Sequence, residues 1–484
     1  MDRSALTQNC TSEKLSKRKE VVDGEDRISN LPESILSHML SFLPTKDAVR
    51  TSVLSTKWID IWTSITNLEF DDTLFLDDTL FDSLRRSTRS RKKYFMNFVD
   101  RVLFHFSNSS IKSFSLFMGP RTKYDPARVS AWISFVLRHR VQKLDIHYFE
   151  DVHISSRSLV SCSCLTELKL WMQCRIRVPT SLCLSNLKIL KLFETKFVND
   201  SFPHSKEIFL NFPVLKVFKC IDCIWLNAQS VCIITPLVES FTIQFPEFTL
   251  MHNESSNCSV KICSSNLERF SYSGHLSEQI LLPNLSSVLD ASISINEPTE
   301  DGEDEADQVG FRACMLLAQL CGMESLKLRD AMMEVLDDGS KFLARVPTFD
   351  KLILLELDSD ITNIETLLDF LHKTPFLQSL AYSQRIFDFG KELLTATVVP
   401  SCLLYHLKVV RLVVSVGWEH EIYLAEFFLE NSKVLEQMTI GKRFEHTDLV
   451  KLERHLTTVP KGSSSATVEF LDYNDEDDSD EESD

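Results

Sequence analysis

One segment decides the fold of this chain: Asp26-Arg27-Ile28-Ser29-Asn30-Leu31-Pro32-Glu33, continued through Leu43-Pro44-Thr45-Lys46 to Trp58 and Trp62. Its apolar residues recur at helical spacing and predict one apolar stripe, made of Ile35, Leu36, Met39, Leu40 and Leu43. Asn30 and Glu33 have the spacing of a capping box, and Pro32 is tolerated in a first helical turn. Pro44 ends this helix, and Thr45 and Ser55 are candidate caps for two more.

Three helices in fewer than 40 residues cannot bury these faces among themselves. The segment also resembles an F-box, in the form seen in plant F-box proteins with leucine-rich repeats. The matching residues are Asp26-Arg27-Ile28-Ser29, Leu31-Pro32-Glu33, Ser41-Phe42-Leu43-Pro44-Thr45-Lys46, Ala48-Val49, Thr51-Ser52, Leu54-Ser55 and Trp58. Lys57 departs from the family, which usually has Arg before the Trp; because the charge is kept, we expect little effect.

The resemblance implies that this helical trio binds a Skp-type adaptor, which links it to a cullin-based ubiquitin ligase. We expect the adaptor-binding residues to be Leu31, Pro32, Leu36, Leu40, Leu43, Pro44, Leu54 and Trp58. The structural alternative is a helical cap on a repeat domain.

Composition is typical of a globular chain of 484 residues, with 44% hydrophobic residues and only 11 Gly and 15 Pro. No apolar run is long enough to span a bilayer, and the polar stretch before the F-box carries no secretory signal, so we expect no membrane partner. The 13 Cys are interpreted as reduced, mostly buried side chains. We expect the protein in the nucleus, the cytoplasm or both.

The net charge of −17 is concentrated in two segments. Residues 297–307 contain seven acids and residues 472–484 contain nine, without any Lys or Arg in either. We expect both segments to be disordered. The remainder is nearly neutral and shows no nucleic-acid footprint.

After the F-box, one unit recurs: an apolar residue, two others, an apolar residue, one other, an apolar residue. It becomes regular from Val141/Leu144/Ile146 and continues through Leu326/Leu328, Phe349/Leu352/Leu354 and Leu377/Leu380/Tyr382 to Leu435/Met438/Ile440. First positions lie on average about 27 residues apart, which is typical of leucine-rich repeats. Because the last two positions share one face of a strand, the units must stack into a parallel sheet with returns that are often helical.

The last repeats acquire a fixed sequence. Pro400-Ser401-Cys402-Leu403, His406-Leu407-Lys408-Val409-Val410, Glu430-Asn431-Ser432 and Val468-Glu469-Phe470 resemble the FBD module found after F-box and leucine-rich-repeat regions in plant proteins. The predicted fold class is therefore α/β: a three-helix F-box, an irregular leucine-rich-repeat solenoid and an FBD cap. The predicted boundaries are a tail at 1–25, the F-box at 26–64, the solenoid at 65–392 with its acidic insertion, the FBD module at 393–471 and an acidic tail at 472–484.

Motifs for catalysis are missing from the sequence. Cys220 and Cys223 form a single CxxC without a second pair, so packing is the favoured role. Paired acids such as Asp71-Asp72 and Asp77-Asp78 are interpreted as solvated loop charges. We therefore expect no catalytic residue, metal or cofactor, and an unidentified target protein as the second partner. Two other hypotheses remain: an F-box scaffold that degrades nothing, and a small-molecule receptor, which a compact basic cluster on the inner loops would favour. A free-standing enzyme is the most distant.

Overall fold

The computed structural model describes residues 28–75, 84–106, 110–120, 123–246, 258–276, 280–283, 287–296, 303–387, 389–396, 398–414, 419–442 and 449–472. The chain forms two compact units, Met1–Ile65 and Thr66–Asp484, which are treated one at a time. The tail predicted at 1–25, most of the acidic tail, residues 297–302 and Asp77-Asp78 lie outside the described residues.

The first unit is a small helical cluster. It consists of α1 (Glu33–Leu40), α2 (Thr45–Arg50) and three turns of 3-10 helix, η1 (Thr51–Val53), η2 (Thr56–Trp58) and η3 (Ile61–Ser64). Leu36 and Leu40 from α1 are buried with Trp58, Ile61 and Trp62. The predicted third helix is therefore a pair of short 3-10 turns, although its expected apolar side is the buried one.

Both α-helices begin directly after a Leu-Pro pair. The Pro32 carbonyl accepts from the amides of Ile35 and Leu36 at 3.0 and 3.2 Å, and the Pro44 carbonyl accepts from the amides of Asp47 and Ala48 at 2.9 and 3.0 Å. Proline is extended at both positions and serves as the N-cap residue, without a side-chain cap. The predicted Asn30 and Thr45 caps are therefore wrong, because each proline occupies the capping position itself.

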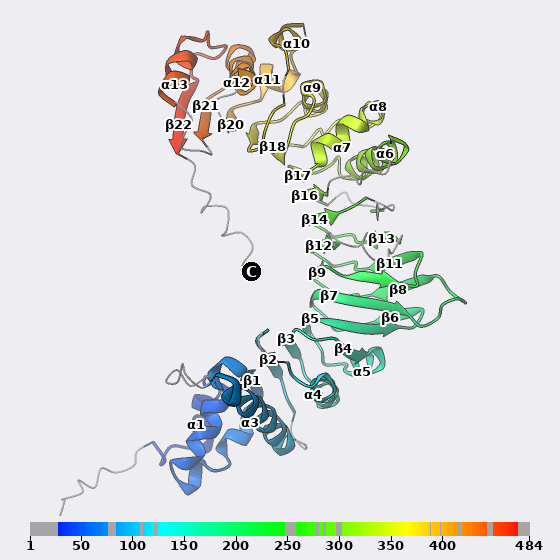
Figure 1. The fold of residues 1–484 in the computed structure, drawn as a ribbon, viewed down its shortest axis with the longest axis vertical. Helices are drawn as coiled ribbons and strands as arrows, with labels where there is room; N and C mark the ends of the chain where they lie inside the picture. Colours follow the sequence, from blue (N-terminus) through cyan, green and yellow to red (C-terminus); the bar gives the residue numbers. More distant parts are fainter. Residues whose placement is uncertain are drawn as a thin grey trace, which may run out of the picture. The chain divides into compact units, whose positions relative to one another are not determined.

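The second unit is built around a 17-stranded parallel sheet. Hydrogen bonding follows the chain from β1 to β22, and the strands stack in that order (Figure 1). The strands are β1 (Asn67–Asp71), β2 (Ser113–Phe117), β3 (Lys143–His147), β5 (Glu167–Val178), β7 (Ile189–Asn199), β9 (Val217–Ile221), β12 (Ser240–Gln244), β14 (Arg269–Gly274), β16 (Asp290–Ile295), β17 (Ser325–Asp330), β18 (Leu354–Ser359), β19 (Ser379–Tyr382), β20 (Val409–Val414), β21 (Gln437–Lys442) and β22 (Thr467–Asp472). Two short strands, β4 (Val152–Ser155) and β10 (Ile224–Leu226), extend the sheet along the second halves of β5 and β7.

The return segments differ along the chain. Helices fill the early and late returns: η4 (Asp72–Phe75), α3 (Leu84–His105), α4 (Pro126–Arg138), α5 (Ser156–Ser161), α6 (Glu303–Gln319), α7 (Met332–Asp338), α8 (Ser340–Leu343), α9 (Ile364–His372), α10 (Lys391–Ala396), α11 (Ser401–Tyr405), α12 (Glu419–Asn431) and α13 (Leu449–Thr458). In the middle, strands form a second parallel sheet instead: β6 (Ser181–Cys183), β8 (Glu207–Asn211), β11 (Ser230–Ile234), β13 (Ser259–Cys263) and β15 (Ile280–Leu281). The α/β fold class, with an N-terminal helical unit and a leucine-rich-repeat type of parallel sheet, is confirmed.

The repeat pattern identifies the core residues. In β17, for example, Leu326 and Leu328 are fully buried, while Lys327 between them reaches the opposite face. One repeat was predicted in the wrong register: Leu355 and Leu357 pair with Leu326 and Leu328, so the unit begins at Leu352. Two overlapping triplets fit the pattern there, and the strand pairing with β17 selects the second.

The structure corrects part of two expectations about acidic residues, for residues 303–307 and for Asp72. The predicted disordered segment 297–307 runs into α6, which begins at Glu303, and Asp307 forms an ion pair with Lys341 of α8. Asp72 is not a solvated charge: it accepts hydrogen bonds from the Gly119 amide at 3.1 Å and the Tyr124 hydroxyl at 2.8 Å. Burial raises the pKa of Asp72 despite these two bonds.

Candidate interaction surfaces

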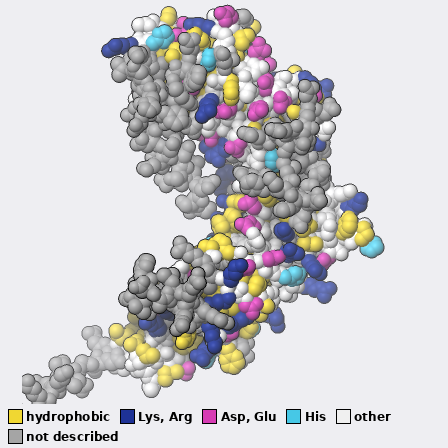
Figure 2. Space-filling view, viewed as in Figure 1, with side chains coloured by type: hydrophobic (Ala, Val, Ile, Leu, Met, Phe, Trp, Pro, Cys, Tyr) yellow, Lys and Arg dark blue, Asp and Glu magenta, His cyan; other side chains and the backbone are white. Residues whose placement is uncertain are grey.

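The first unit exposes an unusual density of large apolar side chains. Those with two fifths or more of their surface exposed are Ile28, Ile35, Met39, Phe42, Leu43, Val53, Leu54 and Ile59. Ile35, Met39 and Phe42 follow one another at helical spacing, beside the buried stripe of Leu36 and Leu40. Hydrophobic side chains are visible at this unit in the space-filling view (Figure 2). Contiguous exposed apolar surface of this kind is typical of a protein-binding site.

The structure separates the eight predicted adaptor-binding residues into two groups. Pro32, Leu43 and Leu54 are exposed, and Leu31 and Pro44 are half-buried. Leu36, Leu40 and Trp58 are at most 4% exposed, so these three support the unit from inside and have no surface to offer a partner. Phe42 and Val53, which are 75% and 84% exposed, were not among the predicted residues.

Polar contacts fix the entry of this unit to its third segment. The Trp58 indole donates to the Ser29 hydroxyl at 2.9 Å, and the Lys57 ammonium donates to the carbonyls of Leu31, at 2.9 Å, and Ser29. These bonds hold the Leu31-Pro32 start of α1 beside the segment that carries Leu54. The half-buried and exposed candidates from both segments are therefore joined by hydrogen bonds within one unit.

A second surface lies on the strands of the large sheet, on the face that points away from the core. Phe117, His147, Trp171 and Phe193 are partners in register across β2, β3, β5 and β7. The rings of His147 and Trp171 stack with centroids 5.3 Å apart, and Trp171 and Phe193 stack at an interplanar angle of 14°. We call these four residues the aromatic row. Sequence reasoning missed it because it followed only the inward positions, although each residue comes directly after the third apolar position of its repeat.

Lysines occupy the outward position two residues before the aromatic row. Lys169, Lys191 and Lys219 are partners in register across β5, β7 and β9, and we call them the lysine row. Asp145 of β3 precedes them, 3.9 Å from the Lys169 ammonium. Beyond β9 the same position is occupied by the uncharged Thr242.

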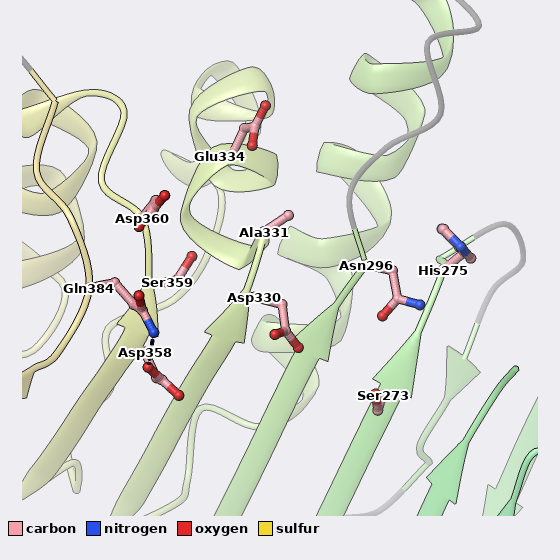
Figure 3. Close-up of a pocket in the computed structure, with 10 residues that line it drawn as sticks. All are labelled: Ser273, His275, Asn296, Asp330, Ala331, Glu334, Asp358, Ser359, Asp360 and Gln384. Atoms are coloured by element: carbon pink, nitrogen blue, oxygen red, sulfur yellow. Dashed lines mark hydrogen bonds between the residues drawn. The ribbon is translucent and has the colours of Figure 1, made fainter. Parts of the chain in front are cut away.

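A polar cleft of about 600 Å³ opens at the carboxyl ends of β14, β16, β17 and β18 (Figure 3). Its lining residues are Ser273, His275, Asn296, Asp330, Ala331, Glu334, Asp358, Ser359, Asp360 and Gln384. Four of them are acids, and none is Lys or Arg. Asp358 is held by the Gln384 amide at 2.6 Å and the Ser383 hydroxyl at 2.8 Å. The cleft is therefore suited to cationic groups.

A smaller cavity of about 370 Å³ adjoins β4, β5 and β7 and is lined by Asp151, His153, Arg175, Arg177 and Val198. Arg175 lies 3.1 Å from Asp151, and Arg177 lies 4.0 Å from Asp200. The two arginines therefore face carboxylates that offset their charge. This arrangement differs from a compact basic cluster on the inner loops, which would favour the small-molecule receptor hypothesis.

Cys220 and Cys223 show the features of packing residues. Cys220 is fully buried in β9, and burial raises the pKa of its thiol well above the ordinary value. The Cys223 thiol donates to the Leu192 carbonyl at 3.6 Å.

Among the described residues, no three His, Cys, Asp or Glu side chains are grouped so that they could hold a metal ion. Within the same residues, no helix is long and apolar enough to cross a membrane.

Two protein families and several plant proteins match this chain. The F-box domain family matches residues 28–70, and the FBD family matches residues 396–440. An F-box/FBD/LRR-repeat protein of Arabidopsis thaliana is 30% identical over 453 residues, which cover 92% of this chain and 94% of that protein. A putative F-box/FBD/LRR-repeat protein of the same plant is 27% identical over 93% of this chain and 94% of its own length. An F-box/LRR-repeat protein, also from Arabidopsis thaliana, is 28% identical over 74% of this chain and 73% of its own length.

Proposed function

The chain belongs to the F-box/FBD/LRR-repeat protein family, and from this membership we propose that it is the substrate-recognition subunit of an SCF-type ubiquitin ligase. In this proposal the helical unit binds a Skp-type adaptor and through it a cullin, while the repeat solenoid binds a target protein. In this role the chain connects the target to the ligase, and ubiquitin transfer is carried out by other subunits.

The observation that carries the proposal is the set of exposed apolar side chains on the first unit. Eight large apolar residues between Ile28 and Ile59 are exposed to solvent. Leaving a Leu or Phe side chain in water forgoes roughly 1.5–3 kcal/mol that burial would supply. A partner that covers several of these side chains recovers that free energy, and a few such anchors dominate affinity.

Co-purification with a Skp-type adaptor tests the first step. We expect the full chain to retain the adaptor and Phe42→Asp/Leu54→Asp to lose it, because a charge would be buried at each anchor. Both side chains are mostly exposed, so the variant keeps its fold. Val160→Asp is the matched control: Val160 lies on α5 of the second unit, is 50% exposed and leaves the first unit unchanged.

A well-folded wild-type chain that retains no adaptor would contradict the proposal. The helical unit would then be a structural cap, and the chain a free-standing repeat scaffold. Equal retention by the double variant would instead place the adaptor on other residues of the unit.

Degradation of the target is a separate step. We expect a target that binds the solenoid to accumulate when the proteasome is inhibited, and also when wild type is replaced by Phe42→Asp/Leu54→Asp. A bound target whose abundance changes in neither case would identify a scaffold that recruits the adaptor without degrading its partner.

Location and remaining partners belong to the same proposal. We propose that the protein acts in the nucleus, the cytoplasm or both, where adaptor and cullin would have to be present, and that neither nucleic acid nor a membrane is its partner. A fluorescent fusion expressed in plant cells checks the location. Exclusive localisation to a secretory compartment would contradict it.

A further inference from the structure

We propose that the aromatic row and the lysine row together form the target-docking surface, and that it takes an extended acidic peptide segment carrying apolar side chains. This inference rests on the proposed role as a target receptor. It assigns one face, five neighbouring strands (β2, β3, β5, β7 and β9) and one ligand chemistry to that role.

Strands of this sheet pair without aromatic side chains at this register. In the same register beyond β9, the outward position is occupied by Gln244, Ser273, Ser294, Arg329 and Asp358, and those strands pair equally well. Phe117 and Trp171 are each 37% exposed on the solvent face of the sheet. Large rings confined to four adjacent strands therefore indicate a contact surface, since such rings are enriched at interface anchors.

Ring geometry determines what kind of ligand fits. The rings of His147, Trp171 and Phe193 cover one another face to face, so they present their edges to a ligand. A nucleic-acid base needs a free ring face for stacking. An edge-lined apolar stripe instead suits aliphatic or aromatic side chains of a peptide.

The lysine row supplies the complementary charge. Three ammonium groups lie on three successive strands, which are about 4.8 Å apart in a sheet. Asp145 is the one carboxylate in this register between Ser115 of β2 and Thr242 of β12. Carboxylates of an extended segment can reach these ammonium groups while its apolar side chains cover the rings.

The cleft limits where such a segment can lie. Asp330, Glu334, Asp358 and Asp360 give the carboxyl ends of β17 and β18 a negative potential, and acidic side chains gather over the upper elements in Figure 2. An acidic ligand is repelled there and is retained on β2 to β9. The two ends of the sheet thus select opposite charges.

Peptide display against the immobilised full chain tests this assignment, with a library of random 12-residue peptides as the probe. We expect enrichment of peptides with Asp or Glu beside Leu, Ile, Phe or Trp. The charge-reversed variant Lys169→Glu/Lys191→Glu/Lys219→Glu should enrich Lys and Arg instead. Trp171→Ser should lose the apolar preference and keep the acidic one.

A matched control carries the same charge change elsewhere. Lys206, Lys261 and Lys351 are exposed and lie off this face, with Lys261 on β13 of the second sheet. Lys206→Glu/Lys261→Glu/Lys351→Glu should enrich the same peptides as wild type. The proposal would be overturned if this control abolished the enrichment of acidic peptides. It would also be overturned if charge reversal on the lysine row left that enrichment unchanged.

Two further measurements distinguish a target peptide from the chain's own acidic tail, and this inference from the proposed function. A synthetic peptide of residues 472–484, which carries nine acids, should bind more weakly than the selected peptides. If it binds as tightly, the surface is occupied by the chain's own tail and the target assignment is wrong. Adaptor retention is measured on the same preparations, so loss of peptide selection with the adaptor still bound refutes only this inference.

Discussion

At the scale of single residues, Lys57 shows how a departure from a family pattern can keep a structural role. The family usually has Arg at this position, and the charge alone predicts no consequence. In the structure the Lys57 ammonium bonds two carbonyls of the entry turn, those of Ser29 and Leu31. The function of the residue is therefore geometric: it holds the start of α1 against η2.

Replacing Lys57 tests this role. Lys57→Met should weaken the first unit by about 1 kcal/mol, the typical net contribution of such a hydrogen bond. Amide hydrogen exchange across 33–64 should then accelerate roughly fivefold, because opening becomes that much more frequent. Lys57→Arg is the control and should exchange as slowly as wild type; an unchanged rate in Lys57→Met would refute the role of the ammonium.

Glu426 is a second residue with a structural role: it joins the helices α10, α12 and α13. Its carboxylate on α12 lies 2.5 Å from the Lys391 ammonium of α10 and 2.5 Å from the His455 ring of α13. Burial by itself would raise the pKa of Glu426, but the hydrogen bonds with Lys391 and His455 outweigh it and hold the pKa below its ordinary value. The ionised form is therefore favoured by the fold.

The sign of this shift predicts a pH dependence. A lowered pKa stabilises the fold above the ordinary glutamate value of about 4.3, and this stabilisation is lost as the pH falls through the lowered pKa. Glu426→Gln should therefore melt below wild type at neutral pH, and the gap should close in acid. Glu453→Gln, at an exposed position of α13, should melt with wild type throughout. A gap that widens in acid would contradict the assignment.

At the scale of elements, the apolar pattern predicts which strands form but cannot always fix their register. Phe349/Leu352/Leu354 and Leu352/Leu355/Leu357 both satisfy the repeat, and only pairing with β17 selects the second. The middle returns form strands because neighbouring returns pair with one another. These are contacts between distant segments, and a local pattern does not contain them.

The exposure of the residues predicted to bind the adaptor could not be read from the sequence for a similar reason. The predicted apolar stripe of α1 is wide, so the sequence locates the helix without deciding which of its apolar residues face inward. The structure buries Leu36 and Leu40 and exposes Ile35 and Met39. Their substitutions should differ accordingly: Leu36→Ala should cost roughly 2–5 kcal/mol in stability, and Met39→Ala should chiefly weaken adaptor binding. Thermal unfolding beside adaptor titration distinguishes the two, and a stable Leu36→Ala would refute the burial.

Two glycines determine how closely α6 can approach the end of α7. A Cβ added to Gly310 would lie 2.6 Å from the Gly339 Cα, which is backbone and cannot rotate aside. Ala in a helix interior normally stabilises by up to about 1 kcal/mol over Gly. At Gly310 the helices must separate instead, so Gly310→Ala should destabilise by roughly 1–3 kcal/mol.

Thermal unfolding and hydrogen exchange in α6 and α7 measure this effect. Gly322→Ala is the matched control, because a Cβ there meets nothing within 4 Å. We expect its melting temperature to equal or slightly exceed that of wild type. A Gly310→Ala chain as stable as Gly322→Ala would show that α6 can shift without loss of contacts.

At the scale of the whole molecule, the solenoid depends on stacking, because each repeat buries its apolar face against its neighbours. Met438 and Ile440 of β21 are fully buried, and all six residues of β21 pair with β22. Next to them, α12 and α13 close the same end of the sheet (Figure 1). The last repeat therefore acts as a cap whose removal exposes both apolar surface and an unpaired strand edge.

Two truncations separate the cap from the acidic tail. Deleting 449–484 removes α13 and β22, so β21 becomes an edge strand with an uncovered apolar face. We expect this chain to self-associate in light scattering and to lose amide protection progressively from β21 toward β17, since stability in a stacked array depends on nearest neighbours. Deleting only 473–484 removes none of the described strands and should change neither readout. If the longer deletion stayed monomeric with β20 and β19 fully protected, the preceding repeats would be self-sufficient. Stability would then be set within each repeat, and the C-terminal module would be free to serve binding alone.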